Sequence, residues 1–260
     1  MVDAPYNVLN ILKKYNLVAK KRFGQNFLVN SDLLSKIANV AQISGKNILE
    51  IGPGPGGLTH AILKECPKKL VSIEIDKNYF NILKNEFIGY NNFEVINNDA
   101  VKINESDYFD GNINVIANLP YNVGTHLLLK WLNNIKIYES FTLLLQKEVV
   151  DRIIAKPNTK EYGRLSVMAQ AITFPKKMFD ISPSSFIPSP KVMSSVIHLK
   201  PKQTNFSFEK LSKITSVLFA NRRKKIRAPI EKLKINVVID LNKRAEELSV
   251  DDFINLSFCL

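Results

Sequence analysis

The sequence predicts an α/β fold: a doubly wound, mostly parallel β-sheet followed by a small all-helical C-terminal domain. Short apolar, β-branched runs alternate with segments of helical periodicity through the first two hundred residues. This alternation is typical of parallel sheets with helices on both faces. A glycine-rich turn, from Gly52 to Gly57, follows the first apolar run. Doubly wound folds bind nucleotide-like ligands at such a turn.

Five apolar runs are expected to form the strands in chain order, at residues 47–51, 70–75, 93–96, 113–117 and 141–145. Amphipathic stretches accompany them. One of these places Leu33, Leu34, Ile37, Ala38 and Ala41 on a single helical face.

The pattern changes after residue 160. We expect a further helix and closing antiparallel strands from the apolar segments 166–174 and 194–199, which a Pro- and Ser-rich loop at 182–190 separates. No strand is evident beyond residue 202, and a helical face begins at Phe208. We therefore divide the chain into residues 1–203, with a basic N-terminal segment, and a helical domain of residues 204–260.

Composition bounds the function. The chain of 260 residues is 45% hydrophobic and 23% charged, as in ordinary soluble globules. It has no apolar run near the roughly 20 residues that span a bilayer, and its start lacks the features of a secretory signal. Three scattered histidines and two distant cysteines predict neither a metal site nor a disulfide framework. We expect a cytoplasmic protein.

Basic residues point to a partner. The net charge of +12 and the pI near 9.5 indicate a polyanion, most simply nucleic acid. Five basic residues between positions 222 and 227 are too dense for pairing along one helix face, so we assign them to RNA phosphates. Lys147 and Arg152 are further candidates, although Glu148 equally allows a surface ion pair with Arg152. The proposed RNA-binding residues are Lys20, Lys21, Arg22, Lys147, Arg152, Arg222, Arg223, Lys224, Lys225 and Arg227.

The most informative stretch is Asn118-Leu119-Pro120-Tyr121. An adenine amine is a poor nucleophile, and an Asn oxygen together with a main-chain carbonyl could accept its two hydrogens and turn its lone pair toward an electrophile. Pro120 restricts Leu119 to extended angles and so orients the Leu119 carbonyl. Tyr121 offers a flat face for a base. By itself, the motif fits a simple strand end equally well.

The glycine turn allows two interpretations. Gly52, Gly54 and Gly57 match the dinucleotide pattern, with Glu74 about 20 residues beyond Gly54 to bind ribose hydroxyls, so a nicotinamide dehydrogenase is a serious rival. Asp99 ends the third strand, where it could accept a bond from a cofactor adenine amine. A hydride-transfer enzyme has no evident use for the Asn-Leu-Pro-Tyr corner. We expect that corner and the glycine turn to face one shared cleft.

The chain resembles the small-subunit ribosomal RNA adenine dimethyltransferases, S-adenosylmethionine enzymes of the Rossmann-like class I methyltransferase fold. The resemblance runs in order from about residue 20 to 230. It rests on residues 24–28, the glycine turn, Glu74, residues 98–100, residues 118–122, and the segments 145–150, 162–167 and 186–194. It fades beyond about residue 230.

The resemblance implies a set of functional residues. Asn118 and Tyr121 would hold the target adenine, with Leu119 and Pro120 completing the corner and Phe186 covering the other face of the base. The implied cofactor, S-adenosylmethionine, leaves as S-adenosylhomocysteine. Its site would be formed by Gln25, Asn26, Leu28, Gly52, Gly54, Glu74, Ile75, Asp99, Ala100 and Asn118.

The implied activity is dimethylation of two adjacent adenosines in the 3′-terminal hairpin of 16S rRNA, by a monomer acting on the assembling 30S subunit. Two alternatives share the fold: a large-subunit rRNA adenine methyltransferase, and a non-catalytic RNA-binding assembly factor. The segments 162–167 and 186–194 favour the small-subunit branch.

Overall fold

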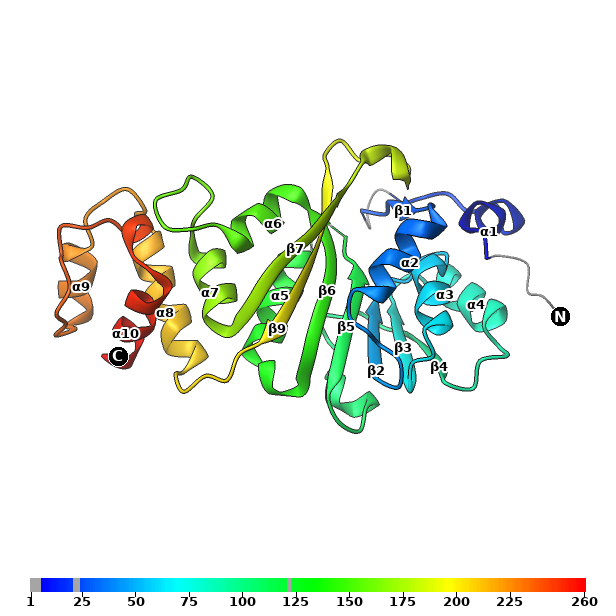
Figure 1. Ribbon diagram of the computed structural model, residues 1–260, viewed down its shortest axis with the longest axis horizontal. Coiled ribbons are helices and arrows are strands. Elements are labelled where there is room, and N and C mark those ends of the chain that lie inside the picture. The colour runs from blue at the N-terminus through cyan, green and yellow to red at the C-terminus, as the bar shows by residue number, and fades with distance from the viewer. Residues whose placement is uncertain (1–5, 21–23, 121–122) are drawn as a thin grey trace.

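The computed structural model describes residues 6–20, 24–120 and 123–260, and a seven-stranded sheet forms its centre (Figure 1). Two further short strands, β1 (Phe27–Leu28) and β8 (Phe186–Ile187), pair antiparallel beside it. In spatial order, the strands of the large sheet are β4 (Phe93–Asn97), β3 (Lys69–Glu74), β2 (Asn47–Ile51), β5 (Ile113–Asn118), β6 (Tyr138–Gln146), β9 (Ser194–Pro201) and β7 (Thr173–Ile181).

The first five strands in this order are parallel, β9 pairs antiparallel with β6, and β7 pairs antiparallel with β9. The chain enters the large sheet at its central strand β2 and moves outward through β3 to β4. It then returns to β5 on the other side of β2. The order therefore reverses between β2 and β5. In doubly wound sheets, ligands bind outside the carboxyl ends of the strands at this reversal.

Alternate residues of the central strands enter two separate hydrophobic cores, as the period-2 geometry of a strand requires. Ile48 and Ile116 face the core that contains α2, α3 and α4. Their neighbours Leu49 and Val115 face the core that contains α5, α6 and α7. Both faces of the sheet are thus covered, which explains why the sequence shows continuous apolar runs at these strands.

Ten α-helices lie within the described part of the chain. The molecule is elongated, with α1 beyond one edge of the sheet and α8 to α10 at the opposite end (Figure 1). The helices are α1 (Val8–Lys14), α2 (Ser31–Asn39), α3 (Gly57–Lys64), α4 (Lys77–Glu86), α5 (Gly124–Asn133), α6 (Lys147–Ile154), α7 (Arg164–Ile172), α8 (Phe208–Phe219), α9 (Arg227–Leu233) and α10 (Val250–Phe258). Short 3-10 turns occupy Glu105–Tyr108, Ile135–Ile137, Pro183–Ser185 and Ala245–Glu247.

The sheet, its strand order and its flanking helices confirm the predicted fold class. The expected helix at 166–174 is wrong at its end, because α7 stops at Ile172 and the next two residues begin β7. Thr173 caps this transition by donating its hydroxyl to the Ala169 carbonyl at 2.8 Å. The apolar run covers both elements, so hydrophobicity alone does not show where the helix ends.

The C-terminal helices pack directly on the larger part of the molecule. Leu211 and Ile214 of α8 share a core with Met168 of α7, and the buried hydroxyl of Tyr162 donates to the Leu248 carbonyl at 2.9 Å. The division of the chain at residue 203 stays a prediction, since this apolar core crosses it. No helix in the described ranges is both long and apolar enough to cross a membrane.

Candidate functional site

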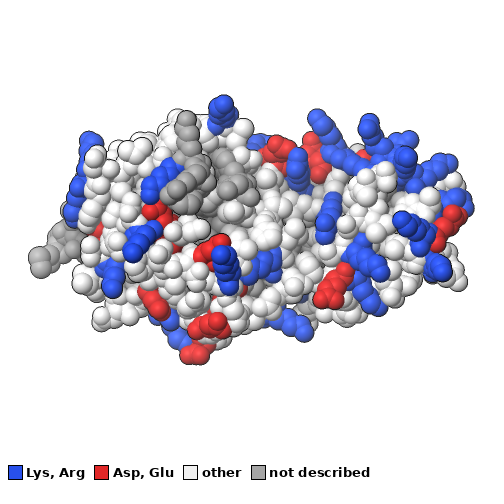
Figure 2. All heavy atoms as spheres, turned by 180° about the vertical axis from the view of Figure 1, so that it is seen from behind, with Lys and Arg blue, Asp and Glu red and all other residues white. Residues whose placement is uncertain are grey.

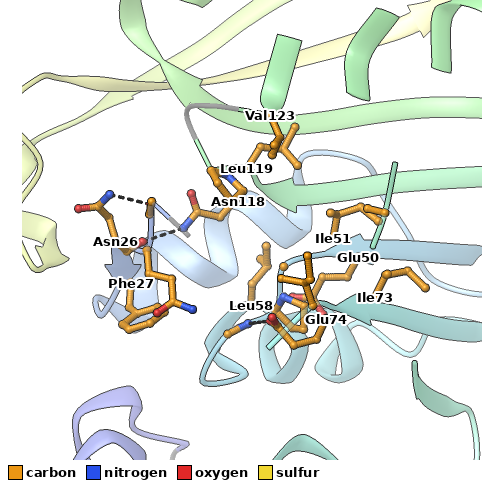
Figure 3. A pocket seen from close by; sticks show the side chains of 18 of the residues that line it. Asn26, Phe27, Glu50, Ile51, Leu58, Ile73, Glu74, Asn118, Leu119 and Val123 are labelled. Carbon is orange, nitrogen blue, oxygen red and sulfur yellow. Dashed lines mark hydrogen bonds between the residues drawn. The ribbon is translucent and has the colours of Figure 1, made fainter. Parts of the chain in front are cut away.

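A cavity of about 260 Å³ opens at the carboxyl ends of β2, β3 and β5, where the strand order reverses (Figure 3). It brings together all the predicted catalytic and cofactor residues that the structure describes. They are Gln25, Asn26, Leu28, Gly52, Gly54, Glu74, Ile75, Asp99, Ala100, Asn118, Leu119, Pro120 and Phe186. The predicted base-holding residue Tyr121 lies outside the described residues, as do Lys21 and Arg22.

The glycine turn forms one wall of the cavity. Gly52 and Gly54 have φ of +66° and +54°, a left-handed conformation that glycine adopts without steric cost. A Cβ on Gly54 would lie 3.0 Å from the Phe27 ring, and one on Gly52 would point toward Pro120 at 4.0 Å. The corner after β5 and the turn after β2 therefore face the same cavity.

Glu74 at the end of β3 holds this turn in place. Its buried carboxylate accepts the Gly54 N–H at 3.0 Å and the Asp76 N–H at 2.8 Å. Burial raises the pKa of Glu74, while these N–H groups lower it. The carboxylate thus lies directly under the backbone of the glycine turn and lines the cavity.

Glu50, a second buried carboxyl, belongs to β2 and lines the floor of the cavity. Its Oε2 accepts the hydroxyls of Ser72 at 2.6 Å and Thr59 at 2.8 Å. Burial raises the pKa of Glu50 to about 7, although the two hydroxyls oppose the rise. Among the described residues, its buried Oε1 has no hydrogen-bond partner. The cavity floor therefore offers an acceptor to a ligand.

Glu50 predicts a pH dependence of stability. An unfolded glutamate titrates near 4.5, so between that pH and about 7 the folded protein holds one proton more than the unfolded chain. The Glu50 contribution to the unfolding free energy therefore falls as pH rises through this window, by up to about 3 kcal/mol, and is constant above it. Glu50→Gln cannot titrate, and urea unfolding without cofactor at pH 5 to 8 should show a shallower decline for this variant.

Glu94→Gln is the control for this experiment, because Glu94 is exposed on β4. Its unfolding free energy should follow the wild-type pH profile. Parallel profiles for the wild-type protein and Glu50→Gln would contradict the account.

The Asn118 side chain lies at the mouth of the cavity, at the end of β5 (Figure 3). Its Nδ2 donates to the Asn26 carbonyl at 3.3 Å. Its Oδ1 is then the side-chain atom that can accept a hydrogen bond from a ligand. The backbone beyond it is anchored, since the Leu119 N–H donates to the Leu144 carbonyl at 3.2 Å. The Pro120 carbonyl accepts the N–H of Gly124, the first residue of α5, at 3.2 Å.

Phe186 lines the cavity although it is distant in sequence from the other residues there. It belongs to β8, which pairs with β1 so that Phe186 lies opposite Leu28. The ring is only 3% exposed and lines the cavity. Part of the Pro- and Ser-rich loop therefore forms a strand pair with β1, which places the ring beside the site.

The other predicted cofactor residues differ in exposure. Ile75, just beyond β3, leaves 52% of its surface exposed although it lines the cavity. Asp99 is half-buried, and its Oδ1 accepts the Val101 N–H at 3.0 Å. An exposed apolar side chain and a carboxylate thus flank the same opening. The first suits the face of the cofactor adenine, and the second suits its amine.

Several predicted RNA-binding residues make internal ion pairs. Lys20 is 2.7 Å from Asp76, and Arg152 pairs with Glu148. Arg222 donates to Glu246 at 2.6 Å and to the Thr159 carbonyl at 3.0 Å. The acid that pairs with Arg222 is 24 residues away, so a search along the local helix face misses it. Lys147 pairs with its neighbour Asp151 on α6.

Sequence reasoning did not assign several residues that line the cavity, including Phe27, Glu50, Ile51, Asn98 and Val123. Glu50 carried a usable signal, because it is a charged residue inside an otherwise apolar strand immediately before the glycine turn. Phe27 had none beyond its position within the 24–28 segment. Phe27 lines the cavity beside Gly54, which is distant from it in sequence.

The cavity fits S-adenosylmethionine. The cofactor presents an ammonium group, ribose hydroxyls and an adenine amine, which all donate hydrogen bonds. The cavity offers acceptors on Glu50, Glu74 and Asp99, and the side-chain-free turn at Gly52 and Gly54 lets a ligand approach the backbone closely. Among the described residues, no group of three or more His, Cys, Asp or Glu is arranged to hold a metal ion.

The chain is similar to known proteins over nearly its whole length. The family model for ribosomal RNA adenine dimethylase matches residues 16–259. Ribosomal RNA small subunit methyltransferase A of Wolbachia sp. subsp. Brugia malayi (strain TRS) is 42% identical over 260 residues, covering 95% of this chain and 99% of the relative. The protein of the same name from Ehrlichia chaffeensis is 41% identical, with coverages of 97% and 100%.

Solved structures of RNA methyltransferases have a similar fold. A dimethyladenosine transferase from Plasmodium falciparum superposes with a TM-score of 0.77 at 28% identity, covering 88% of this chain and 95% of that one. The 23S rRNA methyltransferase ErmE has a TM-score of 0.66 at 21% identity, with coverages of 90% and 99%, and shows the shared fold.

The sheet and its cavity define a class I methyltransferase that uses S-adenosylmethionine. The match over residues 16–259 is specific within that class. The chain belongs to the ribosomal RNA adenine dimethylase family, and the dehydrogenase interpretation of its glycine turn is excluded.

Proposed function

We propose that this enzyme transfers methyl groups to the N6 amines of two adjacent adenosines in the 3′-terminal hairpin of small-subunit (16S) rRNA, on the assembling 30S subunit. The Wolbachia and Ehrlichia relatives, whose names specify the small subunit, support the choice of RNA. We also propose that it acts as a monomer, because a single chain supplies every residue assigned to the cavity.

The orientation of Asn118 carries the proposal. Because its Nδ2 is held by the Asn26 carbonyl, its Oδ1 can accept one hydrogen of an adenine amine. A main-chain carbonyl of the 118–121 corner would accept the other, which turns the lone pair toward the cavity. When bound, S-adenosylmethionine supplies an electrophilic methyl group. The amine nitrogen would take this methyl group, the sulfur would keep the electrons of the C–S bond, and the amine proton would pass to water.

Phe186 would hold the adenine that Asn118 orients. Stacking on an aromatic side chain is worth roughly 1 to 3 kcal/mol per base, and extruding a base from its helix costs a few kcal/mol. Phe186 and Tyr121 on opposite faces of the base would together offset most of this cost. Because the Phe186 ring is already buried and its backbone is paired with β1, little side-chain entropy would be lost on binding.

We propose that RNA phosphates contact the end of the molecule formed by the C-terminal helices. Figure 2 shows Lys and Arg side chains gathered there. Arg223, Lys224 and Lys225 are exposed in the turn between α8 and α9, and Arg227 is exposed at the start of α9. A hollow lies between this turn and the 158–160 loop. It is lined by Arg223, Lys224, Lys160 and the half-buried Arg222. A concave basic surface suits a phosphate backbone.

Two variants separate phosphate contact from stability. Arg223→Ala with Lys224→Ala should weaken RNA binding and reduce the slope of log K against log salt concentration by roughly two units, since each phosphate contact contributes about one. Thermal unfolding should not change, because both side chains are exposed. Filter binding to the 3′-terminal hairpin at several salt concentrations measures the slope.

Arg222→Ala is the matched comparison. It removes the contacts to Glu246 and Thr159, so it should lower the unfolding free energy by about 1 kcal/mol. Its effect on the salt slope should be smaller than that of the double variant. An unchanged slope in the double variant would show that these basic residues do not contact RNA phosphates.

A transfer assay tests the proposed activity. The enzyme with tritiated S-adenosylmethionine should label 30S subunits that lack the dimethyladenosines and leave fully methylated 30S subunits and 50S subunits unlabelled. Digestion of the labelled RNA should place the tritium in N6-methylated adenosines of the terminal hairpin. Labelling of 50S subunits would favour a large-subunit methyltransferase, and no labelling would favour a non-catalytic assembly factor.

A further inference from the structure

The N-terminal segment packs against the outer side of the glycine turn, away from the cavity. Residues 6–15 precede the stretch matched by the family model, which begins at residue 16. Within them, α1 lies beside α3 and α4 in Figure 1, and its Val8 belongs to the same core as Leu58 and Leu83. A segment with no assigned role therefore touches the element that we assign to the cofactor.

Tyr6 makes the most direct contact. Its hydroxyl donates to the Pro55 carbonyl, in the middle of the glycine turn, at 2.6 Å. The ring stacks on His60 with centroids 4.9 Å apart and on Phe87 at 5.3 Å. Burial raises the pKa of Tyr6, so the hydroxyl remains a donor at physiological pH. One carbonyl of the turn is thus held from outside.

The turn has no room to relax toward this segment. A Cβ on Gly56 would lie 2.7 Å from the Tyr6 hydroxyl, and one on Gly57 would lie 2.6 Å from Val8. Both distances are shorter than van der Waals contact, so the backbone of the turn is in direct contact with these side chains. The conformation of residues 54–57 is therefore set partly by the N-terminal segment.

Other contacts fix the segment to the body of the protein. The Tyr15 hydroxyl and the Lys14 ammonium group both donate to Glu86 at the end of α4, at 2.6 and 2.7 Å. Lys20 forms its ion pair with Asp76, whose N–H is bound by Glu74. Residues 14 and 15 thus fix the segment to α4, while Tyr6 and Val8 contact the turn.

We propose that Tyr6 is a positioning residue for the cofactor: by holding the Pro55 carbonyl, it keeps the glycine turn in the conformation that binds S-adenosylmethionine. The inference rests on the cofactor site proposed above. A turn that is already ordered loses less conformational entropy when the ligand binds, so the effect should fall on cofactor affinity. RNA binding and the methyl transfer step itself should be unaffected.

Tyr6→Phe removes the hydroxyl and keeps the ring, and Tyr15→Phe is its matched control. Tyr15 belongs to the same segment and donates an equally short hydrogen bond, but to α4 instead of the turn. Tyr6→Phe should weaken S-adenosylhomocysteine binding by roughly threefold to tenfold, the loss expected for one hydrogen bond. Tyr15→Phe should bind it as the wild-type protein does. Isothermal titration calorimetry measures both.

Steady-state kinetics provides the second readout. Tyr6→Phe should raise the KM for S-adenosylmethionine and leave kcat and the KM for RNA unchanged, whereas a general loss of structure would alter all three. Equal effects of the two variants, or unchanged affinity in Tyr6→Phe, would overturn the inference. If the wild-type protein does not bind S-adenosylhomocysteine at all, the proposed cofactor site fails instead.

Discussion

Asn118→Ala is expected to reduce methyl transfer by at least roughly a hundredfold, while RNA affinity stays within about twofold of wild type. Asn118 Oδ1 is the proposed acceptor that turns the adenine lone pair toward the methyl group, and misplacing a reacting group by about 1 Å can cost a factor of this size. RNA binding depends mainly on phosphate contacts, which this substitution leaves in place. Single-turnover transfer and filter binding measure the two quantities.

A second asparagine near the same strand provides the control. Asn112 is exposed just before β5, at the opposite end of the strand from Asn118. Asn112→Ala should transfer methyl groups at the wild-type rate. If Asn118→Ala lost RNA binding and kept normal turnover, the role assigned to Asn118 would be wrong.

Glu74→Ala should have the second large effect, a loss of cofactor affinity of roughly a hundredfold. The substitution removes a carboxylate that accepts the Gly54 and Asp76 N–H groups, and hydrogen bonds to charged groups are worth about 1.5 to 3 kcal/mol each. It also removes the acceptor proposed for the ribose hydroxyls. Calorimetric titration with S-adenosylhomocysteine measures the loss.

Glu74→Gln should be intermediate, because its single oxygen can replace only one of the two acceptors. Glu94→Ala, on the neighbouring strand β4, changes an exposed glutamate outside the cavity and should leave cofactor affinity unchanged. RNA binding should be unaffected in all three variants. A Glu74→Ala protein that is folded and binds S-adenosylhomocysteine with wild-type affinity would rule out this role.

The sequence was most informative where function and local pattern coincide. The glycine turn, Glu74, Asp99 and Asn118 each lie at or just after the end of a short apolar run, and parallel strands bring such positions to one edge of the sheet. Their arrangement around one cavity follows from strand order alone, so it could be predicted without coordinates. Their roles in binding and catalysis stay predictions for the experiments above.

Contacts between distant segments could not be predicted in this way. Nothing near Arg222 in the sequence indicates that Glu246 pairs with it, or that Tyr6 reaches Pro55 across 49 residues. The end of α7 was also missed, because one apolar run continues through the helix into β7. Each case depends on which surfaces meet after folding, and local composition does not encode this.

By itself, the sequence determined the class of fold, the family resemblance and many of the residues around the cavity, because strand periodicity and the order of polar residues at strand ends are local properties. Only the tertiary structure decided which basic residues form internal ion pairs, which side-chain atom of Asn118 the Asn26 carbonyl holds, and which N-terminal residues contact the glycine turn. These depend on pairings of groups that are distant in sequence. Such pairings exist only once the chain has packed.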